Sequence, residues 1–305
     1  MEDLAIKVNN LSELKYIQEF PNWGYPKNRM TDAFSDEICR TLQNLSSCTI
    51  DRIYFGSEFC EWILPSDNDF SKVIDYCCTH GLKITLLLPP LSEKMLYRLD
   101  NLIRIIHKAP AAVQCEVACN DIGAIHYLHT CDPSIVLLRG RLFQKRIYDP
   151  RVDVASFNRK LTTEGKLVYY DSAISLYEVN VLERMNIRRI ELDTHIDYLH
   201  AESIVGFKHS CYLPFGFFTT GHMCMFQNYL LTSNEKFDLK KSSCSKHCKQ
   251  YYHTMSKRIT ESQSFITSNL MFFRTGNTIF FNNKIIGDIS LLSQYRIVLQ
   301  PFPIL

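Results

Sequence analysis

Short apolar runs alternate with longer amphipathic stretches through the middle of the chain. The short runs are rich in Ile, Val, Leu and aromatic residues, which is typical of strands. The longer stretches repeat apolar residues at positions i, i+3 or i+4, and i+7, as one face of a helix does. This pattern predicts strands over residues 50–56, 83–88, 113–119, 135–138, 167–170 and 187–193. It predicts helices over residues 70–80, 92–107, 120–129 and 175–185.

The order of these elements predicts the fold. Strand followed by helix, repeated, indicates parallel strands joined by right-handed crossovers. At least six such units between residues 50 and 215 favour a closed or nearly closed α/β barrel of the TIM type. Near the C-terminus, runs at 277–281, 284–286 and 297–301 indicate short strands of a hairpin or a closing appendage. We expect one barrel-like domain over residues 1–265, including the cysteine-bearing loop, and a short β-rich segment over 266–305 packed on it.

Composition narrows the class of protein. The 305 residues are 46% hydrophobic and carry 34 basic against 32 acidic side chains, which excludes a disordered or coiled-coil chain. The near-neutral charge argues against a basic nucleic-acid scaffold. Nucleic-acid contact stays open, because a basic cluster lies between cysteines, although such a cluster is more often a solvated loop. The cluster consists of Lys236, Lys240, Lys241, Lys246 and Lys249.

The first residues, MEDLAIKVNN, lack the cationic stretch and apolar core of a secretory leader. No apolar run approaches the roughly 20 residues that a membrane-spanning helix requires. We therefore expect a cytoplasmic protein without a membrane segment. In such a reducing compartment the 12 cysteines call for burial as small hydrophobes or for metal binding.

The cysteines separate into two groups by context. Eight lie in apolar helical or strand-like sequence, where a buried thiol is expected: Cys39, Cys48, Cys77, Cys78, Cys115, Cys119, Cys131 and Cys211. Cys60 instead follows the first strand of the barrel pattern, whereas Cys224, Cys244 and Cys248 fall in irregular sequence after a later strand. Loops after barrel strands emerge at one face, so these four thiols are predicted to share a rim.

Four thiolates at one rim can bind a tetrahedral zinc ion or an iron–sulfur cluster. The pair Cys244 and Cys248 does not indicate radical chemistry with S-adenosylmethionine, because Tyr251 stands where a C-x₃-C-x₂-C motif needs its third cysteine. Zinc stays possible, since His247 and His253 lie near the pair. The residues alone leave both metals open.

Three segments resemble the collagenase-like peptidase superfamily, in particular its UbiV-type iron–sulfur branch. IYFGSEFC at 53–60 is similar to a strand and loop that lead into a cluster-binding cysteine there. NDIGAIHYL at 120–128 is similar to the Asp-x-Gly turn after a barrel strand of that family. LPFGFFTTGHMC at 213–224, followed by CSKHC at 244–248, is similar to the segment with the other three cluster cysteines.

The resemblance implies a [4Fe–4S] cluster bound by Cys60, Cys224, Cys244 and Cys248, with zinc as the alternative. It implies a role in oxygen-independent hydroxylation, or a related cluster-dependent modification, of a small molecule, a peptide or RNA. Such proteins are expected to work as a heterodimer with a UbiU-like member of the superfamily. Two alternatives follow from it: a non-catalytic cluster-bearing subunit of the paired homologue, and a collagenase-like peptidase.

Two features of the chain depart from the family pattern. It lacks the His-Gly-x-x-Cys run of the peptidase and UbiU-type members, and the segment between Cys224 and Cys244 is longer than in UbiV-type members. The substrates of those members therefore cannot be assigned directly to this chain. Whether the chain is itself an enzyme stays open.

Polar residues at the predicted strand ends are candidates for binding a substrate. A cluster with four cysteine ligands is coordinatively closed, so other groups must activate the substrate. Arg141 can bind a carboxylate through its guanidinium fork or form an ordinary salt bridge. Asp193 and His195 can form an acid–base pair or be a solvated loop pair, and Asp121 can cap the helix that begins at Ile122. Arg139 and Asp171 share this predicted face, and His222 can tune the cluster or be a plain loop histidine.

Overall fold

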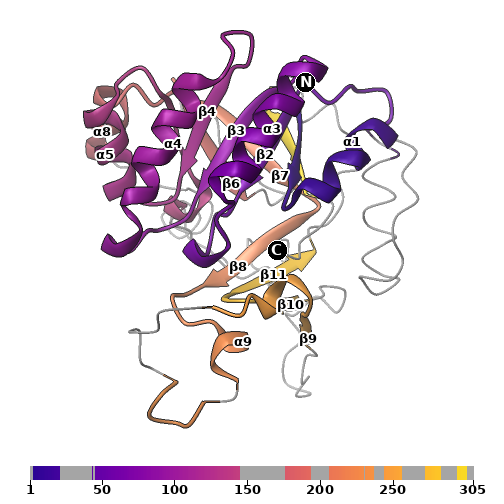
Figure 1. Cartoon of the computed structure of the whole chain (residues 1–305), viewed down its shortest axis with the longest axis vertical. Coiled ribbons are helices and arrows are strands. Elements are labelled where there is room, and N and C mark those ends of the chain that lie inside the picture. The colour runs from indigo at the N-terminus through magenta and orange to yellow at the C-terminus, as the bar shows by residue number, and fades with distance from the viewer. Residues whose placement is uncertain are drawn as a thin grey trace, which may run out of the picture.

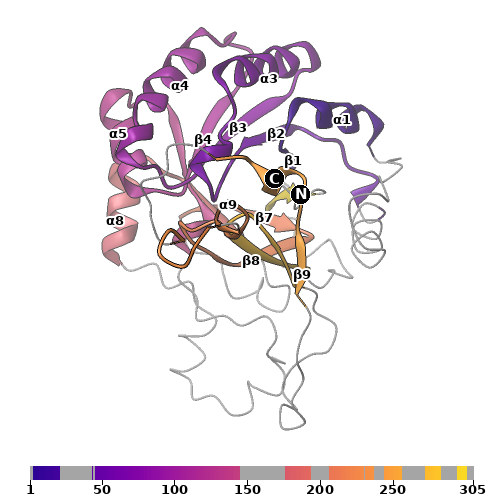
Figure 2. The same cartoon turned by 60° about the horizontal axis from the view of Figure 1, so that its bottom comes forward.

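Eight parallel strands close into a barrel. The computed structural model describes residues 3–20, 43, 45–144, 176–193, 206–229, 231–236, 244–255, 272–282 and 294–300. Within these residues the barrel order is β1-β12-β7-β6-β5-β4-β3-β2, and helices surround it (Figures 1 and 2). The predicted α/β barrel of the TIM type is therefore confirmed. Its strands are β1 (Leu4–Val8), β2 (Arg52–Gly56), β3 (Lys83–Leu88), β4 (Cys115–Cys119), β5 (Val136–Arg139), β6 (Arg189–Asp193), β7 (Lys208–Leu213) and β12 (Arg296–Leu299).

The helices begin and end where local sequence signals place them. The hydroxyl of Ser66 accepts a hydrogen bond from the amide of Asp69 at the start of α3, and Gly81 ends that helix with a φ of +66°. Asp121 caps α5 by accepting from the amide of Gly123, which confirms the predicted cap. The helices are α1 (Lys15–Glu19), α3 (Asp67–His80), α4 (Tyr97–Lys108), α5 (Ile122–Cys131), α8 (Leu176–Arg184) and α9 (Met225–Asn228).

The barrel interior has an apolar layer and charged layers. Seven strands contribute one side chain each to the apolar layer, namely Ala5, Tyr54, Leu87, Ala118, Leu138, Tyr212 and Val298. Charged side chains are also buried inside, among them Lys7, Arg141 and Glu191. A buried charge is costly unless it is paired, so the interior ion pairs matter for stability.

A small antiparallel sheet lies at one end of the barrel (Figure 1). Its order is β8 (Phe215–Thr220), β11 (Thr278–Asn282), β10 (Phe272–Thr275) and β9 (His253–Met255). Because β7 ends at Leu213 and β8 begins at Phe215, this sheet stands at the mouth formed by the carboxyl ends of the barrel strands.

The C-terminal segment contributes to both sheets. β10 and β11 belong to the small sheet, where β8 and β9 from before residue 265 join them. β12, expected in a hairpin or closing appendage, pairs in parallel with β1 and β7 and closes the barrel. All four residues of β12 are buried, so its apolar pattern reflects a position inside the barrel wall.

Some expectations fall outside the described residues. They are the strand at 167–170, the run at 284–286, Cys39, Asp171, His195, Lys240 and Lys241. Among the residues that the structure describes, no helix is long and apolar enough to cross a membrane.

Candidate metal centre

The loop after β2 carries Cys60. β2 ends at Gly56, which has a φ of +126° and where an added Cβ would lie 2.4 Å from the carbonyl oxygen of Leu87, so only glycine fits. Ser57 then closes the loop by donating to the carbonyl oxygen of Cys60 at 2.9 Å and accepting from the Cys60 amide at 3.2 Å. The backbone at Cys60 is therefore fixed by its own neighbours.

Glu58 anchors the same loop to the barrel interior. Its carboxylate accepts from Lys7 Nζ at 2.7 Å and from Arg141 Nε and Nη2 at 2.7 and 2.8 Å. Burial alone would raise the pKa of Glu58, but Arg141 and Lys7 outweigh it and hold the pKa at about 2. The three side chains are at most 1% exposed, so they form a closed ion cluster inside the barrel.

Arg141 and Asp193, two of the predicted substrate-binding residues, belong to this ion cluster. Arg141 Nη1 donates to Asp193 at 2.6 Å, and its guanidinium lies 4.0 Å from the centre of the Tyr212 ring. The other Asp193 oxygen accepts from the Phe217 amide at 2.9 Å. A substrate carboxylate would therefore have to displace Glu58 or Asp193 from Arg141. Their role in substrate binding stays a prediction, as does that of Asp193 with His195.

Asp121 and Arg139 also have protein partners. Besides capping α5, Asp121 accepts from the Leu91 amide at 3.2 Å and so ties two loops of the mouth together. Arg139 pairs with Glu178 of α8 at 2.8 Å, which places it on the outer wall of the barrel. Substrate binding by Asp121 stays a prediction too.

Cys224, Cys244 and Cys248 lie near Cys60, although they come from the segment after β8. The pKa of Cys60 is raised to about 12, mainly by burial and in smaller part by Cys248, Cys244 and Cys224. Such mutual effects need short separations, because salt screens charges beyond about 10 Å. Cys248, only 3% exposed, packs in a small apolar cluster with Ile63 and Cys60. The four cysteines thus share one neighbourhood at the barrel mouth.

The surroundings of these thiols suit a cluster in two respects. The amide of Lys246 points at Cys244 Sγ at 3.4 Å, and N–H···S contacts of this kind tune iron–sulfur clusters. Lys246 has a φ of +55°, which turns the chain sharply between Cys244 and Cys248. Among the described residues, no three or more His, Cys, Asp or Glu side chains group closely enough to hold a metal ion. A [4Fe–4S] cluster spreads its four thiolates over four irons, so its ligands do not converge on one ion.

One hairpin turn between β10 and β11 connects the cysteine-bearing segments. Asn277 Nδ2 donates to the carbonyl oxygens of Phe59 and Gly221, both at 2.7 Å. Thr275 donates to the carbonyl oxygen of Cys248 at 3.1 Å. The turn therefore touches the residue before Cys60, the segment leading to Cys224, and Cys248 itself. Sequence reasoning missed both side chains, because a polar residue in a hairpin turn is usually explained by the turn alone.

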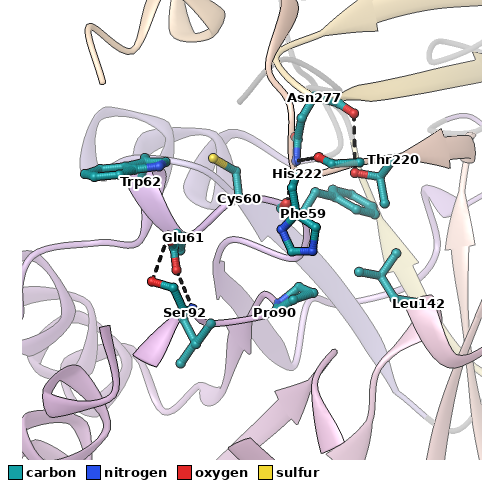
Figure 3. Close-up of a pocket in the computed structure, with 12 residues that line it drawn as sticks. Phe59, Cys60, Glu61, Trp62, Pro90, Ser92, Leu142, Thr220, His222 and Asn277 are labelled. Carbon is teal, nitrogen blue, oxygen red and sulfur yellow. Dashed lines mark hydrogen bonds between the residues drawn. The ribbon is translucent and has the colours of Figure 1, made fainter. Parts of the chain in front are cut away.

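A hollow of about 250 Å³ opens beside Cys60 (Figure 3). Its apolar wall includes Phe59, Trp62 and Leu142. On its polar side His222 faces the hollow, and Glu61 accepts hydrogen bonds from Ser92 N and Oγ at 2.7 and 3.1 Å. A ligand in this hollow would stand next to the first of the four thiols.

No protein-family model, no curated protein and no solved structure matches this chain. Function is therefore inferred from the arrangement of the chain's own residues. The informative features are the shared neighbourhood of four thiols, the turn that connects their segments and the hollow beside Cys60.

Proposed function

We propose that this chain is a UbiV-type iron–sulfur protein of the collagenase-like peptidase superfamily. Its [4Fe–4S] cluster would be bound by Cys60, Cys224, Cys244 and Cys248. The observation that carries the proposal is that Cys60 packs beside Cys248 in one small apolar cluster at the mouth of the barrel, although the two cysteines come from distant segments. The effect of Cys248, Cys244 and Cys224 on the pKa of Cys60 supports it. The donor set supports it, because four cysteine thiolates are the usual ligands of such a cluster.

The proposed reaction is an oxygen-independent hydroxylation or a related cluster-dependent modification, carried out in the cytoplasm. A cluster with four thiolate ligands supplies electrons and has no open position for the substrate. The protein would therefore hold the substrate beside it, and the hollow next to Cys60 is the natural place. Binding of the cluster requires all four thiols to lose their protons. Burial raises the pKa values of Cys60, Cys224 and Cys248, so binding of the cluster releases protons from these three thiols.

A second candidate is a non-catalytic, cluster-bearing subunit. One observation favours it: Arg141 and Asp193, expected to handle substrate, are bound to each other and to protein groups inside the barrel. In this role the chain would pass electrons to a UbiU-like partner in a heterodimer. Purifying the chain with and without such a partner, and assaying hydroxylation by each, separates the two candidates.

Anaerobic purification tests the cluster. We expect a brown protein with about four iron and four sulfide per chain and a broad absorbance near 400 nm. Cys60→Ala is expected to lose the iron although Cys60 is far in sequence from the other three ligands. Cys78→Ala is the matched control. The prediction that Cys78 and Cys131 are buried is wrong, because both are exposed, and Cys78 lies on α3. Full iron content in Cys60→Ala, or a colourless zinc protein, would contradict the assignment.

A further inference from the structure

The hollow beside Cys60 continues into a second hollow of about 370 Å³. Both are lined by Thr220, Gly221, His222 and Asn277, so the two hollows adjoin at these residues and are treated as two lobes of a cleft. We call them the apolar lobe, at Cys60, and the cationic lobe, which Arg274 lines. At about 250 Å³ the apolar lobe is below the range of about 300–1,000 Å³ typical for drug-sized ligands, so its occupant is small.

Glu61 lines only the apolar lobe, and Arg274 lines only the cationic lobe. In the apolar lobe the carboxylate of Glu61 is already bound to Ser92. In the cationic lobe Arg274 Nη1 lies 3.5 Å from the sulfur of Met225, and its buried Nε has no hydrogen-bond partner. No described carboxylate forms an ion pair with Arg274. The charge of Arg274 acts on the thiol of Cys224 and partly offsets the rise in the pKa of that thiol. A guanidinium that lines a hollow and has no described carboxylate partner is suited to bind an anion, because its planar fork matches carboxylate oxygens.

The wall of the apolar lobe suits a flat, apolar body. Trp62, Pro90 and Leu142 are partly exposed there. The Phe59 ring is fixed from behind by Phe217 and Phe280, at centroid distances of 5.3 and 5.4 Å. Aromatic walls of this kind bind rings by stacking and edge contacts.

We propose that this cleft binds a small organic monocarboxylate, with its flat apolar body in the apolar lobe and its carboxylate on Arg274. The carboxylate of Glu61 would repel a second negative charge on the ligand in the apolar lobe. This repulsion favours a ligand with one carboxylate and directs that carboxylate to Arg274. This inference deepens the proposed function by naming the chemistry of the ligand, and it rests on that function only for the cluster beside the ligand. The bound body would lie against the loop of Cys60, within reach of electron transfer.

Trp62 provides a direct reporter of binding. The chain has two tryptophans, so Trp23→Phe leaves Trp62 as the only one. Phenylacetate is the probe, with phenylacetamide as its uncharged analogue and acetate as the anion without a ring. In the full-length protein we expect phenylacetate to quench Trp62 and to bind at least about tenfold more tightly than either analogue.

Two variants locate the site. Arg274→Met should weaken the binding of phenylacetate at least about tenfold and leave the weak binding of phenylacetamide unchanged. Arg104→Met, on the exposed face of α4, is the control and should bind like the parent. Gly221→Leu is the second variant: a Cβ at Gly221 meets no atom within 4 Å, so the fold tolerates a side chain that blocks the junction of the lobes.

The outcomes separate this inference from the cluster. If an anaerobically purified protein lacks iron but binds phenylacetate in a way that depends on Arg274, the inference is supported and the proposed function is contradicted. A protein with four iron that fails to bind phenylacetate, or binds phenylacetamide equally well, overturns the inference alone. Unchanged binding by both Arg274→Met and folded Gly221→Leu also overturns it.

Discussion

The ion cluster inside the barrel and the cysteines at its mouth are built in opposite ways. Lys7, Glu58 and Arg141 are fully enclosed, and every charge has a partner at normal hydrogen-bond distance. Cys60 and Cys224 are half-buried, and Cys60 packs beside Cys248. A closed, satisfied network has no capacity for a ligand, whereas thiols gathered around one place do. We therefore expect the buried charges to stabilise the scaffold and the thiols at the mouth to serve the proposed function.

The ion cluster and the cysteines are nevertheless joined through one short loop. Glu58 and Cys60 belong to one loop, with only Phe59 between them. The ion pairs of Glu58 therefore hold the backbone that presents the thiol. Substitutions in this loop should therefore affect both stability and metal binding.

Breaking the ion cluster is expected to have the largest effect on the free energy of unfolding. Glu58→Gln leaves Lys7 and Arg141 buried with too little negative charge, which should cost about 3–5 kcal/mol of unfolding free energy. Iron content should fall as well, because the loop of Cys60 loses its anchor. Urea unfolding followed by circular dichroism measures the first effect, and iron analysis measures the second.

The matched control is Glu93→Gln, at an exposed site before α4. It should change stability by less than about 0.5 kcal/mol. A loss in Glu58→Gln as small as that of the control would show that the buried charges are compensated in another way.

Acid should weaken the barrel before it affects the mouth. Burial lowers the pKa of His209 on β7 to about 4, from an ordinary value near 6.5, and Arg189 adds to this. Unfolded chains bind the proton first, so His209 stabilises the fold above pH 6.5, and this contribution is lost as the pH falls to 4. The loss amounts to about 3 kcal/mol. In the metal-free chain the thiols of Cys60 and Cys248 stay neutral throughout, because burial raises their pKa values to about 12 and 11.

The measurement is the unfolding free energy at pH 7, 5.5 and 4 for the parent chain and for His209→Gln. The variant should lose less stability than the parent across this window, since glutamine does not titrate. Parallel pH profiles for the two proteins would exclude His209 as the source of acid sensitivity.

The smallest stability effect should come from Asn277, with a large effect on metal. Asn277→Ala removes two neutral hydrogen bonds, worth about 0.5–1.5 kcal/mol each. Because those bonds fix the segments of Cys60 and Cys224 relative to each other, iron per chain should drop severalfold. Asn101→Ala removes a bond to Asp67 far from the cysteines and is the control.

Asn101→Ala should lose comparable stability while keeping its full iron content. Equal iron content in the two variants would mean that Asn277 stabilises the fold without positioning ligands. Iron content is informative here because a purely structural role would leave it unchanged.

The sequence predicted the regular part of the fold. β2 to β6 and the helices between them follow a local periodicity that reports which side chains face the core. β1 escaped detection, because its five buried residues include Lys7, which interrupts the apolar run. β12 was assigned to an appendage, since strand character does not reveal the partner of a strand.

Only the part of the site that follows from the barrel topology could be predicted from the sequence. Strand-end geometry brings Cys60 to the other three cysteines whatever their separation along the chain. The partners of Arg141 could not be predicted, because Glu58 is 83 residues away and charge patterns carry no information on long-range pairing. The same holds for Asn277, whose contact with Phe59 spans 218 residues.

The position of β12 sets the order in which the molecule can be assembled. All four cysteines precede β12 along the chain, so during synthesis they emerge while β1 and β7 still have open edges. Arg296 of β12 then supplies the positive charge beside Glu116 and Asp3. Until it arrives, the nascent barrel exposes two unpaired strand edges, the usual templates for aggregation. The four thiols of the proposed cluster are thus synthesised before the strand that closes the barrel.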